Sequence, residues 1–230
     1  MLPRIYTLDC PAPGHIVDSQ PLAQICSSCG LPSASYDWVN YELETWNGCE
    51  LLSSAPVLFV TDALHNRLLA ASVRGFKSQA TDTSYSQQYF LGGARATQVP
   101  RLWLMMITGQ ADGPWTRQRR ATRCAQCGRW SAEPLTPQEF QEMSEEIREK
   151  SPARPTLVDA RTWQGEDIFR VTEPGRPLVT EKFAEILRET GNLGATCCSL
   201  GPAEWVCDIQ TNAAARTLAD CARLENIPNP

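Results

Sequence analysis

The sequence predicts an α+β fold of mostly antiparallel strands with a few helices, and three observations lead to this prediction. Short apolar runs bounded by proline and glycine recur along the chain, as is typical of strands. Only a few segments carry the capped pattern, with apolar residues on one side, that indicates a helix. Two copies of a CxxCG motif, at residues 26–30 and 124–128, indicate one split site around which the strands are organised.

The strand candidates follow one another through most of the chain. The first is residues 5–8, and an aromatic segment at residues 36–46 follows the first CxxCG motif. The later candidates are residues 55–60, a strand that begins near Gly75, and residues 99–108, 167–171 and 195–200. Residues 81–88 are polar throughout, so we expect them to form a loop.

Threonines that can cap a first turn mark the expected helix starts. Thr61 precedes a helix that runs towards residue 71, and Thr136 begins one that runs towards residue 150, with Glu139 completing a capping box. Thr180 precedes a third helix, whose apolar side chains share one face: Phe183, Ile186 and Leu187. Residues 211–224 are a further helix candidate.

Length and composition set the domain organisation. A globular chain of 230 residues with 42% hydrophobic residues can bury a good core without a metal. We expect residues 1–150 to form a region that holds the two CxxCG motifs with a large insertion between them. Residues 151–230 are expected to be an α+β segment packed on the same core.

Charge and targeting signals narrow the classes of function. The net charge of −5 opposes nucleic-acid binding, which usually needs a basic domain. The first residues lack the charged and apolar regions of a secretory signal, and the longest apolar runs are too short to span a bilayer. We therefore expect a cytoplasmic protein that does not act at a membrane.

Ten cysteines are many for a chain of this length, and four of them form the two patterned pairs. In a chain with no export signal, such pairs indicate metal binding rather than disulfides. The other six are expected to be mostly packing residues: Cys10, Cys49, Cys197, Cys198, Cys207 and Cys221.

Each CxxCG motif places two thiolates on a tight turn that its final glycine permits. Two such turns supply four sulfur ligands in a tetrahedron, which suits zinc. The sequence therefore predicts a structural zinc ion, in a site like that of a zinc ribbon, with four ligands: Cys26, Cys29, Cys124 and Cys127. Residues 30–123 would then leave the metal and return to it, so that zinc closes a long loop.

The paired cysteines and the basic run beside them each allow other interpretations. The four cysteines can be buried by coincidence, with no shared ion. A CxxC pair can be a thioredoxin-like redox site, although neither motif here begins an evident helix. The basic run Arg117, Arg119, Arg120 and Arg123 can either offset the negative charge of a zinc tetrathiolate or bind phosphates in a zinc-ribbon nucleic-acid module. A catalytic zinc is not expected, because four cysteines leave no open position and neither His15 nor His65 has ligand spacing.

No motif of an enzyme is evident elsewhere. The sequence contains no glycine-rich phosphate loop, no HExxH and no GxSxG. Four acidic residues near the C-terminal third have no histidine partner and are interpreted as solvated surface: Asp159, Glu166, Asp167 and Glu173. The adjacent Cys197 and Cys198 are expected to point to opposite faces of a strand. We therefore predict that the chain is not an enzyme.

The paired CxxCG motifs resemble the double-CXXCG family of bacterial immunity proteins. Three segments of the C-terminal third are similar to that family's C-terminal block: residues 167–170 (DIFR), 177–183 (PLVTEKF) and 193–196 (LGAT). This resemblance implies a cytoplasmic antidote that binds a cognate protein toxin delivered by sibling cells and blocks it by occlusion. The toxin, the contact residues and the oligomeric state cannot be predicted from the sequence.

Overall fold

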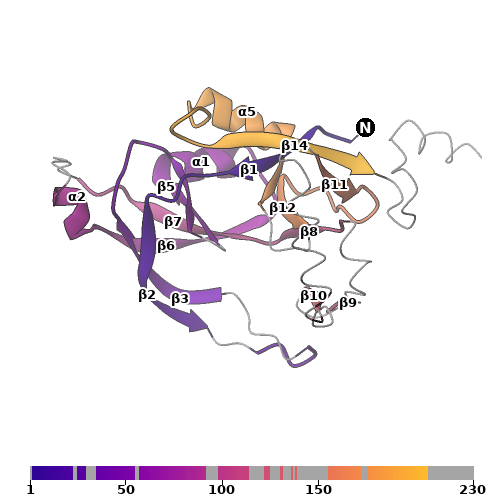
Figure 1. Ribbon diagram of the computed structural model, residues 1–230, viewed down its shortest axis with the longest axis horizontal. Helices are drawn as coiled ribbons and strands as arrows, with labels where there is room; N and C mark the ends of the chain where they lie inside the picture. Colours follow the sequence, from indigo (N-terminus) through magenta and orange to yellow (C-terminus); the bar gives the residue numbers. More distant parts are fainter. Residues whose placement is uncertain are drawn as a thin grey trace, which may run out of the picture.

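A computed structural model of the chain describes residues 2–22, 25–29, 35–54, 57–91, 98–113, 122–124, 130–131, 136, 138, 155–171 and 176–206. Within them, the strands form two six-stranded sheets and one two-stranded hairpin (Figure 1). Three short helices accompany the strands in the described residues: α1 (Asp62–Ala70), α2 (Gln87–Leu91) and α5 (Glu181–Glu189). The prediction of an α+β fold with mostly antiparallel strands is confirmed.

The first sheet is built from the first half of the chain. Its strands, in spatial order, are β2 (Gly14–Leu22), β3 (Ser35–Leu43), β6 (Phe76–Tyr85), β7 (Leu102–Ile107), β5 (Val57–Thr61) and β4 (Leu51–Ser54). All of its neighbours are antiparallel except β3 and β6. Every residue of β5 is buried, as its continuous apolar run requires of an inner strand.

The second sheet combines the N-terminal strand with the last third of the chain. Its order is β11 (Thr156–Asp159), β14 (Ser199–Val206), β1 (Ile5–Asp9), β13 (Leu178–Thr180), β12 (Ile168–Val171) and β8 (Gly109–Ala111). The pairs β11–β14 and β8–β12 are parallel. A separate hairpin pairs β9 (Thr122–Arg123) with β10 (Trp130–Ser131).

The main core lies between the two sheets and the helices α1 and α5, which pack against each other (Figure 1). Leu8 and Leu51 from the first half of the chain meet Phe183 and Leu187 of α5 there, and all four are almost completely buried. These contacts join α5 to both sheets, which is the burial that its one-sided apolar pattern predicted.

Two helix starts behave differently, although both lie where they were predicted. The Leu64 amide donates to the Thr61 hydroxyl at 3.4 Å, so Thr61 caps α1 as expected. Thr180 also precedes α5, but its hydroxyl donates to the Asp167 carboxylate instead of capping the helix. The helices predicted at 136–150 and 211–224 lie outside the described residues, apart from Thr136 and Gln138.

The expected loop at residues 81–88 is wrong. Strand β6 continues to Tyr85, and α2 begins two residues later. The polar residues of β6 remain extended because β6 lies between β3 and β7, whose backbones supply its hydrogen bonds. The inner position of β6 in the sheet therefore keeps it a strand although its sequence lacks the apolar pattern of one.

Two of the four acidic residues interpreted as solvated surface are instead buried. Asp159 is fully buried beside Arg161, whose guanidinium nitrogens lie 2.7 and 3.0 Å from its two carboxylate oxygens. Asp167 is also buried, and it accepts hydrogen bonds from three groups that are described below. No helix in the described residues is long and apolar enough to cross a membrane.

Candidate metal centre

The first CxxCG motif lies at the end of a long hairpin. Strands β2 and β3 pair antiparallel from Gly14 opposite Leu43 to Leu22 opposite Ser35. Val39, Tyr41 and Leu43 anchor the base of the hairpin in a second hydrophobic cluster. Because the strands pair as far as Leu22 and Ser35, the connection between them, which contains Cys26 and Cys29, is held at the far end of this arm (Figure 1).

The second CxxCG motif lies within the connection of the small hairpin. Arg123 of β9 pairs with Trp130 of β10, and Cys124 follows β9 directly. Both motifs thus interrupt a pair of antiparallel strands. This placement explains how two turns far apart in sequence each present a cysteine at the end of a hairpin.

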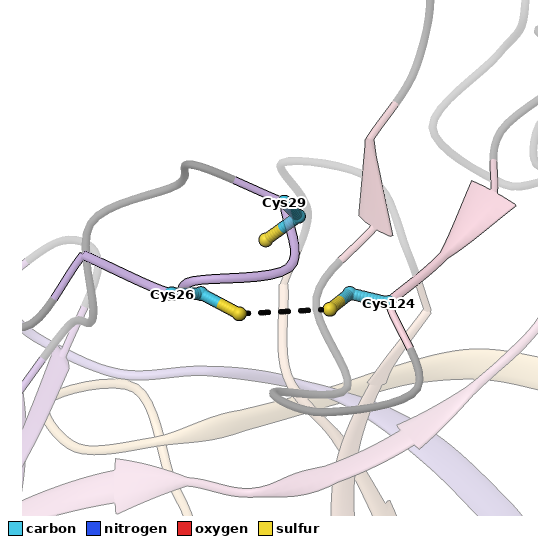
Figure 2. A group of neighbouring side chains, drawn as sticks. All are labelled: Cys26, Cys29 and Cys124. Carbon is cyan, nitrogen blue, oxygen red and sulfur yellow. Dashed lines mark hydrogen bonds between the residues drawn. The ribbon is translucent and has the colours of Figure 1, made fainter.

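The structure brings three of the four predicted ligands together. The sulfurs of Cys26, Cys29 and Cys124 all lie within 4.8 Å of one another, and all three residues are partly buried. Figure 2 shows Cys26 and Cys29 on one turn and Cys124 on the facing segment, with the three sulfurs directed towards a common space. Three thiol groups within this distance can hold a metal ion.

The spacing of the sulfurs fits a tetrahedral thiolate site. The Sγ atoms of Cys26 and Cys124 are 3.7 Å apart. A zinc–sulfur bond of about 2.3 Å gives a tetrahedral sulfur–sulfur edge of about 3.8 Å. A disulfide would instead need a sulfur–sulfur distance of about 2.05 Å. This distance excludes a disulfide between Cys26 and Cys124, and it is compatible both with two ligands of one ion and with a hydrogen bond between the two thiols.

The fourth predicted ligand, Cys127, lies outside the described residues. The same holds for Arg117, Arg119 and Arg120 and for the side chain of Arg123, so the two interpretations of the basic run stay predictions.

The two histidines lie away from the three-cysteine group, as their spacing predicted. His15 faces Glu44, with Nδ1 2.9 Å from the carboxylate. His65 is buried on α1, where its ring stacks on Trp103 at 4.4 Å and Nε2 lies 2.7 Å from the Ser78 hydroxyl. Within the described part of the chain, the three cysteines form the one group with metal-ligating geometry.

The remaining described cysteines form two close pairs that the sequence analysis missed. Cys49 and Cys197 are joined by a disulfide, so the expectation that they are packing residues is wrong. Cys10 and Cys198 lie with their sulfurs 3.4 Å apart. Cys197 and Cys198 lie before β14 rather than within the strand predicted at residues 195–200, and each belongs to a different hydrophobic cluster. Their partners could not be predicted, since they lie more than a hundred residues away.

A hollow of about 650 Å³ opens beside β1, β11 and β14. Apolar side chains, including Leu2, Leu157 and Trp205, form much of its wall, and Arg4 and Glu204 are its charged residues. It lies in the second sheet, whereas the cysteine group lies at the end of an arm of the first sheet.

No family model matches this chain. A search of the curated proteins likewise finds no match. The assignment of a function therefore depends on the site itself and on the motifs of the sequence.

Proposed function

We propose that the chain binds one structural zinc ion through Cys26, Cys29, Cys124 and Cys127. The observation that carries this proposal is the convergence of three of these sulfurs, with Cys26 and Cys124 at the spacing of a tetrahedral edge. An all-thiolate donor set suits zinc in an organising role, because it is closed to water and substrate.

The ion would fasten the β2–β3 arm to the β9–β10 hairpin. The β9–β10 pair is only two residues long on each side, and such a hairpin is marginal without further support. Metal binding and folding are coupled in sites of this kind, because the ligands are brought together only in the folded state. The expected role is thus mechanical: the metal holds two hairpin ends in a fixed relation.

We predict one zinc ion per chain by elemental analysis of the reduced, purified protein. Cys26→Ser and Cys124→Ser should each lose the metal, because each removes a thiolate from a different hairpin. Ser27→Ala is the matched control, since it changes an exposed residue of the same turn and keeps every ligand. Zinc retained in both cysteine variants, or absent from the wild-type protein, would contradict the shared site.

We propose further that the protein is an immunity protein that binds a cognate protein toxin and neutralises it by occlusion. The support is the resemblance of the paired CxxCG motifs and of residues 167–170, 177–183 and 193–196 to the double-CXXCG family. Such a role needs stoichiometric binding and no turnover. A zinc-held arm would suit it, because a pre-organised surface loses less conformational entropy on binding.

The probe for this proposal is the protein encoded by the gene beside that of this chain. Co-expression should restore growth to cells that the neighbouring protein arrests, and calorimetry should give a 1:1 complex. The Cys124→Ser variant should protect less well than Ser27→Ala if the arm takes part in binding. An arrest that the wild-type chain does not relieve, with no binding in the calorimeter, would refute the immunity role while leaving the zinc measurement intact.

The runner-up is a nucleic-acid-binding or regulatory module, and the basic run from Arg117 to Arg123 is the feature that favours it. It predicts binding to DNA or RNA that weakens steeply with salt and that Arg119→Glu reduces further. If neither duplex DNA nor single-stranded RNA binds in titrations at low salt, this alternative is excluded.

A further inference from the structure

Cys10 and Cys198 lie at the end of one strand pair. Strands β1 and β14 are antiparallel, with Leu8 opposite Leu200 and Asp9 opposite Ser199. Cys10 follows Asp9 and Cys198 precedes Ser199, so the two cysteines flank the last pair of this ladder.

The two sulfurs are already in contact. They lie 3.4 Å apart, and the Cys198 thiol is fully buried in the main core while Cys10 is partly exposed. The approach of about 1.4 Å that a bond requires is small enough for rotation about the two Cα–Cβ bonds to supply.

The neighbouring residue already makes a bond of this kind. Cys197 is joined to Cys49, just before β4, whereas Cys198 faces Cys10, just after β1. The two adjacent cysteines between α5 and β14 therefore contact two different segments of the N-terminal half. A single bond at Cys197 fastens their turn to the first sheet, and a bond at Cys198 would fasten the end of β14 to β1 within the second sheet.

We propose that Cys10 and Cys198 are a redox-active pair that closes into an interstrand disulfide when a small-molecule disulfide such as glutathione disulfide oxidises the protein. The Cys10 thiolate attacks one sulfur of glutathione disulfide, which forms a mixed disulfide and releases one glutathione. The Cys198 thiolate then attacks the Cys10 sulfur and releases the second glutathione. The two cysteines lose two electrons, and the two protons they lose are carried by the two glutathione thiols.

The order of these steps follows from exposure. Only Cys10 can be reached from solvent, so it receives the oxidant, and Cys198 completes the bond from within the core. Contact with the Cys198 sulfur and burial raise the pKa of the Cys10 thiol, so its thiolate is scarce and the first attack is slow. The site is separate from the metal centre and does not depend on the proposed immunity role.

The test maps the disulfides of the full-length, zinc-loaded protein before and after long incubation with excess glutathione disulfide at pH 8. Free thiols are alkylated, and the chain is cut before aspartate and after lysine and arginine without reduction. This digestion places Cys10 in residues 9–17, Cys49 in residues 37–61, and Cys197, Cys198 and Cys207 together in residues 189–207, so the cysteine variants are needed to assign a link to one of these three. Before oxidation, residues 9–17 should carry the alkyl label.

After oxidation, residues 9–17 should be linked to residues 189–207 in the wild-type protein. The link should persist in Cys197→Ala and vanish in Cys198→Ala, in which Cys49 should stay linked to Cys197. A Cys10 that remains alkylated in the wild-type protein overturns the proposal, and so does a Cys10 link that survives Cys198→Ala. Whether Cys10 becomes linked to residues 189–207 is decided by the wild-type protein alone, even if a variant does not fold.

Thermal unfolding supplies a second readout. Closing a loop between residues 10 and 198 should raise the unfolding midpoint of the wild-type protein on the order of 5–10 °C. The same oxidant should leave the midpoint of Cys10→Ser unchanged. If the oxidant shifts the unfolding midpoints of the wild-type protein and Cys10→Ser equally, its effect arises at other cysteines and the proposal is overturned.

Discussion

At the scale of single residues, buried polar groups are held by partners from distant parts of the chain. The Asp167 carboxylate accepts hydrogen bonds from the Arg74 amide at 2.9 Å, the Thr180 hydroxyl at 3.1 Å and the Lys182 ammonium at 3.1 Å. A buried carboxylate without such partners would lower the free energy of unfolding by several kcal/mol. This network explains why an aspartate is tolerated between α5 and the segment after α1.

The buried His65 leads to a prediction about how stability depends on pH. Burial lowers the pKa of His65, and the nearby Asp62 opposes this shift only in part. A proton on the ring would charge a group whose Nδ1 has no hydrogen-bond partner within the described structure. The unfolded chain therefore takes up the proton first as the pH falls, so we expect the free energy of unfolding to decrease below pH 6.5.

The measurement is urea unfolding between pH 5 and pH 8 for the wild-type protein and His65→Gln. The variant should show a smaller slope below pH 6.5, because glutamine does not titrate. His15→Gln is the matched control, since it removes a half-exposed histidine and leaves His65 in place. Both variants keep all four predicted metal ligands, so any acid release of metal affects them equally. Identical slopes in the two variants would show that His65 does not couple to folding.

At the scale of elements, the two sheets meet at a backbone contact that requires glycine. Gly75 has φ of +103°, and a Cβ on it would overlap the carbonyl oxygen of Ile168 in β12. Its own carbonyl accepts hydrogen bonds from the amides of Thr108 and Gly109, between β7 and β8. The close approach of three segments thus depends on a residue without a side chain.

Gly75→Ala should lower the free energy of unfolding by about 2–4 kcal/mol, because backbone strain and steric overlap add. Gly48→Ala is the matched control: its φ is +91°, but a Cβ there meets nothing within 4 Å. The control should lose only the conformational part, about 1 kcal/mol. Urea unfolding of both variants measures the difference, and losses of the same size would show that the Ile168 contact carries no cost.

At the scale of the whole molecule, a covalent bond joins the segment before β4 to the turn before β14. The Cys49–Cys197 disulfide spans 148 positions of sequence and ties the first sheet to the turn before β14. The long separation matters, because a cross-link that closes a large loop removes much of the freedom of the unfolded chain.

Cys197→Ala should therefore lower the free energy of unfolding by about 2–5 kcal/mol under non-reducing conditions. The reductant tris(2-carboxyethyl)phosphine should lower the stability of the wild-type protein towards that of the variant and should have little effect on the variant. Paired urea titrations with and without reductant make the comparison. A reductant effect that is just as large in Cys197→Ala would assign the stabilisation to other cysteines.

What the sequence by itself determined is local in nature. The Thr61 cap, the one-sided apolar pattern of α5 and the run at β5 each depend on residues close in the chain, and all three were confirmed. The turn that carries Cys26 and Cys29 was equally evident, because the spacing within its motif encodes it. The convergence of Cys26, Cys29 and Cys124 followed from the chemistry of sulfur ligands, and the binding of an ion there stays a prediction.

Only the tertiary structure decided the features that depend on distant partners. Strand β6 was missed because its neighbours, rather than its own residues, hold it extended. Asp159 and Asp167 were misplaced on the surface because the groups that stabilise a buried carboxylate lie elsewhere in the fold. The partners of Cys197 and Cys198 were invisible for the same reason: a sequence states which face a side chain takes, whereas packing alone decides what that face meets.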